Sequence, residues 1–167
     1  MYSKIQDFTA DWKVEEQSTL TIFAAIKNEV KATKINENVR SLERLAWHIT
    51  QTLTEMPSRA GIIEKDVLDN KPIPDSFSEI IQTYQQHSDE LIRLLKENWK
   101  DDELTDSIEV YGGQKWEKRK ILDVLVKHQI HHRGQMTAIM RLLDNEVPGI
   151  YGPAKQEWAK FGMEVQE

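Results

Sequence analysis

Apolar residues recur every three or four positions along four long stretches of the chain, a pattern that predicts helices with one buried face. The four stretches cover residues 9–30, 39–56, 76–99 and 116–145. Pro57 is expected to end the second helix because proline cannot donate the next helical hydrogen bond. Ser76-Phe77-Ser78-Glu79 has the sequence of a capping box and is expected to start the third helix. A short last helix is expected over residues 154–162.

The connections between these helices differ in length. The links occupy residues 34–38, 58–74 and 101–115 and are polar or contain proline or glycine. The last link contains a β-like run at residues 108–111, expected to be irregular or one brief extended piece, followed by a Gly112-Gly113 turn. Long amphipathic helices joined by unequal links predict an all-α protein, a single four-helix-bundle domain over residues 1–167 with one or two crossover connections.

The amino-acid composition excludes several classes of binding partner and of active site. The 167 residues include 39% hydrophobic and 30% charged residues, and the net charge is −6. An acidic chain is a poor ligand for nucleic acid, because phosphate binding requires clustered lysine and arginine. Cysteine is absent, which excludes disulfides, thiolate ligands and a cysteine nucleophile. No stretch approaches the roughly 20 apolar residues of a membrane span, so we expect a cytoplasmic protein with no membrane partner.

The fourth predicted helix carries the most distinctive chemistry. Three of the five histidines lie within residues 128–132, and the i, i+4 spacing of His128 and His132 places both on one helix face, in an otherwise aliphatic stripe. His131 lies at the margin of the stripe, and Arg133 is expected to point away from it. An imidazole in an apolar core requires a hydrogen-bond partner or a metal. The pair therefore has two interpretations, separate hydrogen-bonded core histidines or a shared metal.

The two remaining histidines lie on other predicted helices. His48 lies at about 100 degrees from the apolar stripe of the second helix, where it is either solvated at a groove edge or a third ligand. His87 lies at the edge of the third stripe and is expected to face solvent. The chain has no Glu-x-x-His or His-Glu-x-x-His motif, so a di-iron carboxylate site and the metalloprotease signature are excluded. A metal in this bundle would be bound mainly by histidine.

Three segments together resemble the DinB-like family. They are Arg40-Ser41-Leu42 with Trp47-His48-Ile49, then His128-x-x-x-His132-Arg133-Gly134-Gln135, then Pro148-Gly149-Ile150-Tyr151-Gly152. The resemblance extends over about residues 10–153. It implies an up-down-down-up four-helix bundle, commonly a homodimer, that binds one divalent metal through three histidines. Those ligands would be His48, His128 and His132, whereas His131 does not occupy a ligand position.

The resemblance also implies a class of reaction. Related members use low-molecular-weight thiols such as bacillithiol or mycothiol, so our first hypothesis is a metal-dependent transferase that joins such a thiol to an electrophilic substrate. Three protein ligands leave a coordination position open, as in catalytic sites. Imidazole ligands suit zinc or nickel, which we favour, as well as iron and copper. A metal-dependent hydrolase that uses bound hydroxide and a non-enzymatic metal-binding or ligand-binding dimer are the alternatives. The family name refers to induction by DNA damage and hence to a stress response.

Supporting residues can be suggested only as candidates. Glu16 and Glu55 are carboxylates that could orient the imidazoles. Tyr111, Tyr151 and Trp47 are candidates for the pocket wall, although ordinary packing is the favoured interpretation for each. The sequence assigns no catalytic residue.

Overall fold

The computed structural model describes residues 1–165 and is mainly helical. Four long helices form its body: α1 (Ile5–Ala25), α2 (Leu42–Arg59), α3 (Phe77–Asn98) and α4 (Lys118–Leu142). Between α3 and α4 lie the 3₁₀ helix η1 (Asp101–Glu103), the strand β1 (Ser107–Glu109), the 3₁₀ turn η2 (Tyr111–Gly113) and the strand β2 (Lys115–Glu117). A last 3₁₀ helix, η3 (Lys155–Phe161), follows α4.

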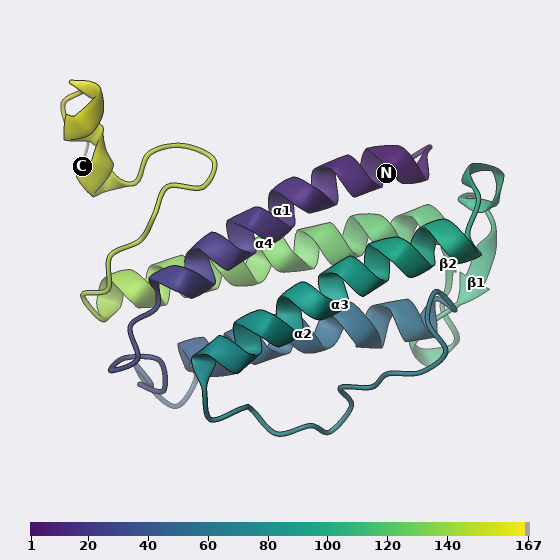
Figure 1. Ribbon diagram of the computed structural model, residues 1–167, viewed down its shortest axis with the longest axis horizontal. Helices are drawn as coiled ribbons and strands as arrows, with labels where there is room; N and C mark the ends of the chain where they lie inside the picture. The colour runs from purple at the N-terminus through teal and green to yellow at the C-terminus, as the bar shows by residue number, and fades with distance from the viewer. Residues whose placement is uncertain (166–167) are drawn as a thin grey trace.

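The four long helices form the expected up-down-down-up bundle (Figure 1). Helix α4 packs against α1 and α2, and α3 packs against the same two helices. Helices α1 and α4 run in one direction, and α2 and α3 run in the other (Figure 1). Because α2 and α3 are parallel, the link over residues 60–76 must return along the length of the bundle, and this explains its length.

The boundaries of the first two helices differ from the prediction. Helix α1 begins at Ile5, earlier than residue 9, because the backbone N–H of Ile5 donates to Asp101 Oδ1 at 2.8 Å. A cap supplied from so far along the chain leaves no local sequence signal. Helix α2 passes through Pro57 and ends at Arg59. The prediction that Pro57 stops the helix was wrong, since a proline in the last turn costs only one hydrogen bond.

The start of α3 also departs from the prediction. Ser76 is the N-cap residue, but its side chain accepts no hydrogen bond from the helix backbone. Its Oγ lies 2.5 Å from Oγ of Ser78 instead. The capping box was therefore wrong as a hydrogen-bonding prediction, although the helix starts where expected. Ser41 does cap α2, because its Oγ accepts from the Arg44 N–H at 3.3 Å.

The link before α4 forms a small hairpin. Strands β1 and β2 pair antiparallel, with Ile108 opposite Trp116. Gly112 and Gly113 make the turn with φ of 62° and 80°, angles that residues with a side chain adopt at a cost. The β-like run expected at residues 108–111 is confirmed in part, because Ile108 and Glu109 belong to β1 whereas Tyr111 starts the 3₁₀ turn. Its partner β2 was missed because residue 116 had been assigned to the fourth helix.

Large apolar side chains from all four helices form one core. The largest fully buried members include Trp12, Phe23, Leu53, Tyr84 and Leu91. The expected last helix is present as the 3₁₀ helix η3, which lies away from the bundle in Figure 1, and Phe161 at its end is 65% exposed. No helix within residues 1–165 has the length and apolar character needed to cross a membrane.

Candidate metal centre

Three histidines from two helices converge between α2 and α4, with His132 buried and His48 and His128 half-buried. One ring nitrogen from each of His48, His128 and His132 lies within 4.8 Å of the others. The Nε2 atoms of His128 and His132 are 3.1 Å apart, and the His48 ring centroid lies 5.0 Å and 4.7 Å from those of His128 and His132. The groove-edge position of His48 on α2 therefore faces α4 rather than solvent. These three side chains could hold a metal ion.

The buried face of α4 is rotated relative to the predicted stripe. His132 is buried as expected, but Gln129 and Arg133 are more completely buried, and His128 is half-buried at the margin. The expectation that Arg133 points away was wrong. Its guanidinium forms an ion pair with Glu15 of α1 and donates to Thr19 Oγ1 at 3.0 Å. A helical wheel assigns such a side chain to solvent because it cannot show a buried partner on another helix.

Gln135 determines which nitrogen of His132 carries the proton. Its Oε1 lies 2.8 Å from Nδ1 of His132, and its Nε2 lies 3.1 Å from Nε2 of His131. In this orientation the amide oxygen accepts from His132 and the amide N–H donates to His131. The proton of neutral His132 is therefore on Nδ1, and its Nε2 presents a lone pair toward His128.

Burial keeps the three imidazoles neutral. Desolvation, followed by the charge of His132 and the cations Arg40 and Arg44, lowers the pKa of His48 from 6.5 to about 4. Desolvation and the neighbouring histidines lower the pKa of His128 to about 3. Desolvation also lowers the pKa of His132, although its hydrogen bond with Gln135 acts in the opposite direction. Near neutral pH each ring can therefore offer a lone pair to a metal.

The donor set fits a divalent transition metal. The geometry places Nε2 of His132 toward Nε2 of His128, an arrangement that a cation between two lone pairs would satisfy. Nδ1 of His128 is buried and has no hydrogen-bond partner among the residues that the structure describes. A metal on Nε2 would not pair this atom, so the unpaired Nδ1 does not by itself distinguish a metal ligand from a structural histidine. With three nitrogen donors and no carboxylate or thiolate in the group, the set corresponds to an incomplete coordination shell, the type found in catalytic sites.

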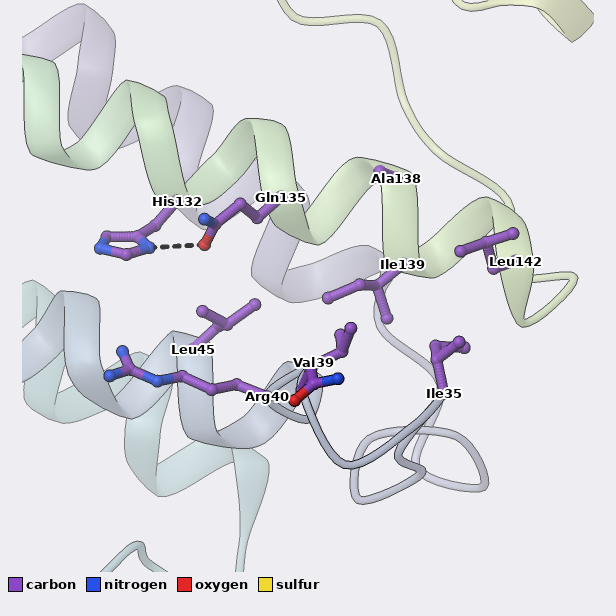
Figure 2. A pocket seen from close by; sticks show the side chains of 10 residues that line it. Ile35, Val39, Arg40, Leu45, His132, Gln135, Ala138, Ile139 and Leu142 are labelled. Carbon is purple, nitrogen blue, oxygen red and sulfur yellow. Dashed lines mark hydrogen bonds between the residues drawn. The ribbon is translucent and has the colours of Figure 1, made fainter.

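A cavity of about 550 Å³ opens beside His132 (Figure 2). Residues from the 26–41 link, α2 and α4 line it, and Figure 2 shows His132, Gln135, Ala138, Ile139 and Leu142 along α4 on one side. Its volume is typical of a small-molecule site. The candidate metal centre thus borders a space large enough for a ligand.

The other predicted polar residues lie outside this centre. His131 is exposed and contacts Gln135. The expectation that His87 faces solvent was wrong, because it is 8% exposed, with Nδ1 3.1 Å from Glu90 Oε2. Glu55 accepts from the Tyr111 hydroxyl at 2.8 Å, and desolvation raises the pKa of half-buried Glu16. Neither carboxylate forms a hydrogen bond with the three histidines.

The three aromatic candidates for the pocket wall make structural contacts. This agrees with ordinary packing, the interpretation that the sequence favoured for each. The indole N–H of Trp47 donates to the Lys71 carbonyl at 3.0 Å. The Tyr151 hydroxyl donates to Glu15 Oε2 at 2.6 Å, and Tyr111 bonds to Glu55. None of the three lines the cavity beside His132.

A four-helix bundle of this topology with three converging histidines defines a class of small helical proteins with a potential metal centre. The DinB family model matches residues 1–167, and the chain belongs to the DinB family. It is 35% identical over 165 residues to the uncharacterized protein YrdA of Bacillus subtilis (strain 168), covering 99% of this chain and 98% of that protein.

Two solved structures are similar in fold. A DinB-like protein from Bacillus cereus ATCC 10987 matches with a TM-score of 0.82 and 30% identity, over 90% of this chain and 100% of that chain. The DinB-like protein YjoA from Bacillus subtilis matches with a TM-score of 0.69 and 15% identity, over 89% of this chain and 99% of that one, a likeness of fold alone.

Two residues beside the histidines, Arg40 and Gln135, stand in the segments that resemble the family but were given no role of their own from the sequence. Gln135 follows His132 by three positions, the spacing of side chains that meet on a helix, so this contact had a readable signal. Arg40 lines the cavity and contributes to the lowered pKa of all three histidines. It had no such signal, because it precedes α2 and reaches the cavity only through the course of the link.

Proposed function

We propose that this protein binds one divalent transition metal through His48, His128 and His132 and uses it to transfer a low-molecular-weight thiol to an electrophile. The observation that carries the proposal is the convergence of three neutral imidazoles beside a ligand-sized cavity. Zinc and nickel are the favoured metals, and iron is an alternative. Membership of the DinB family supports the same conclusion.

The protein's own residues prepare the site in three ways. Gln135 Oε1 holds a proton on Nδ1 of His132, which leaves Nε2 free to bind metal. Burial of the three rings keeps them unprotonated near neutral pH. Leu45 and Ile139 make one side of the cavity apolar, and electrostatic interactions are stronger beside apolar surface than in open solvent.

The chemistry follows from these conditions. A divalent ion held by His48, His128 and His132 would supply the positive charge that lowers the pKa of a nearby thiol. The thiol loses its S–H proton to solvent, and its sulfur forms a bond to the electrophilic carbon. The leaving group departs with the electron pair of the bond that connected it to that carbon. The cavity beside His132 is the space in which the electrophile would lie.

Elemental analysis of the purified protein tests the metal. We expect about one equivalent of metal per chain in the wild type, little in His48→Ala and His128→Ala, and an unchanged content in His87→Ala. The last is a matched control because His87 lies on α3, contacts Glu90 and is not part of the three-histidine group. A wild type that takes up no divalent ion under any loading condition would refute the proposal.

The thiol step has its own test. Cobalt-loaded protein should change its visible spectrum when bacillithiol or mycothiol is added, and should accelerate conjugation of that thiol to a chloronitrobenzene. Turnover of esters or phosphoesters without thiol would instead identify a hydrolase. Tight metal binding with neither response would identify a non-enzymatic binding protein.

A further inference from the structure

Arg40 carries a positive charge without a partner at the mouth of the cavity. It lies immediately before Ser41, the N-cap of α2, and is exposed. Within residues 1–165 its side chain forms neither a hydrogen bond nor an ion pair. Of the neighbouring cations, Lys31 pairs with Glu43 at 3.4 Å, whereas Arg44 donates to the neutral amide oxygen of Gln51 at 3.2 Å and keeps an unpaired charge of the same sign. Arg40 is therefore available to a ligand.

The cavity has a polar end and an apolar end. In Figure 2 the guanidinium of Arg40 lies at the same end as the His132 ring, and Ile35 and Leu142 lie at the opposite end. Leu45 and Ile139 line the stretch between them (Figure 2). Leu142 is 68% exposed, more than Ile130, the other exposed large apolar residue of α4 at 38%. A ligand that lay along this wall would cover Leu142.

The charge of the cavity is of one sign. None of the described residues that line it is acidic, although the whole chain has a net charge of −6. A cation held in an acidic protein without a counter-charge selects for anions at that position. The planar guanidinium forms paired hydrogen bonds with carboxylate or phosphate oxygens.

We propose that the cavity binds a small amphipathic anion, with its carboxylate or phosphate group on Arg40 and its apolar body along Leu45, Ile139 and Leu142. The proposal names the chemical class of the molecule brought to the candidate metal centre. The reaction of this anion rests on the proposed function. Its binding does not, because the anion contacts Arg40 and the apolar wall without a metal.

Binding to metal-free protein tests the assignment. Octanoate, octyl phosphate and the neutral octanamide are titrated into chelator-treated protein by calorimetry, and chemical shifts of labelled protein locate the site near Ala138 and Leu142. We expect saturable binding of at least one anion and about tenfold weaker binding of octanamide, the value of one charge-assisted hydrogen bond. Comparing the affinities of octanoate and octyl phosphate identifies whether the site prefers a carboxylate or a phosphate group.

Three variants sharpen the test. Arg40→Gln should weaken anion binding about tenfold and leave octanamide binding unchanged. Arg40→Lys keeps the charge but not the paired geometry, and should give intermediate affinity. Arg93→Gln removes the same charge from an exposed ion pair with Glu97 on α3, outside the cavity, and should bind anions like the wild type.

The result that overturns this proposal is anion binding unchanged by Arg40→Gln, equal affinity for octanamide, or no saturable binding of either anion to folded protein. Metal content of the same Arg40→Gln protein separates the two proposals. Loss of anion binding with an intact metal content supports the role of Arg40. Failure of the wild type to bind metal, with Arg40-dependent anion binding retained, overturns the proposed function and leaves this assignment standing.

Discussion

Replacing Arg133 with methionine should destabilise the protein strongly, although the residue lies outside the candidate metal centre. The Arg133 side chain is 4% exposed and that of its partner Glu15 is 11% exposed. The guanidinium also donates to the Glu15 carbonyl at 2.9 Å and to the Tyr151 hydroxyl. Methionine keeps the aliphatic stem but leaves the Glu15 carboxylate buried without its cation, a loss that costs about 3–5 kcal/mol.

We expect a value of about 3 kcal/mol, at the lower end of that range, because the Tyr151 hydroxyl still donates to Glu15 at 2.6 Å. With a urea m value of about 2 kcal/mol/M, the unfolding midpoint should fall by about 1.5 M. Urea titration followed by circular dichroism measures this shift. Arg93→Met is the control, since the Arg93 and Glu97 side chains are 57% and 53% exposed and such pairs contribute about 0.5 kcal/mol.

A double-mutant cycle tests the cause of the loss. Glu15→Gln removes the charge that Arg133→Met leaves unpaired, so the double variant should be more stable than the sum of the single effects predicts, by at least about 1 kcal/mol. Strict additivity, or an Arg133→Met shift no larger than that of Arg93→Met, would refute the reasoning.

Three further predictions concern the site and the turn. Metal binding should be retained at pH 7 and lost on acidification, which metal titrations at several pH values measure. The metal-free protein should lose stability as the pH falls from 6.5 toward 4. The reason is that the pKa values of His48 and His128 are lowered in the folded state, so the unfolded chain binds more protons in this range, and melting temperatures across the range measure the loss. Gln135→Leu removes the acceptor for His132 and should weaken metal binding about 10-fold to 100-fold, measured by competition with a chromophoric chelator. Gly112→Ala places a side chain at φ 62° and should lower the free energy of unfolding by about 1 kcal/mol. Gly134→Ala in α4, where an added Cβ meets nothing within 4 Å, should raise it by about 0.5–1 kcal/mol. Thermal unfolding of the two variants compares them.

The helices and the histidine cluster were accessible from sequence because both depend on local spacing. The 3.6-residue period predicted four long helices, and the i, i+4 spacing of His128 and His132 placed two imidazoles together. The third, His48, required more than periodicity. Its position on the wheel left a solvated side chain as an open alternative, and only the resemblance selected it.

What sequence reasoning missed depends on contacts between distant segments. Arg133 was assigned to solvent because a period-based argument treats every arginine as polar surface, whereas its partner Glu15 lies 118 positions away. The start of α1 was placed too late for the same reason, since Asp101 caps it from the far side of the chain. Strand β2 was absorbed into α4 because a three-residue strand has no period of its own.

Helix α4 carries two adjacent i, i+4 polar pairs that differ in how their polar atoms are satisfied. Gln129 and Arg133 face α1 and α3, where Glu15, Thr19 and Tyr84 provide their partners, and only Nε2 of Gln129 is left without one among the described residues. His128 and His132 face α2, where their Nε2 atoms meet each other. Burial of polar groups is stabilising only when they are paired. Each pair leaves one buried nitrogen unpaired among the described residues, Nε2 of Gln129 and Nδ1 of His128. Only the second pair is joined by a third histidine, so the group on the α2 side of α4 is the one that could hold a metal ion.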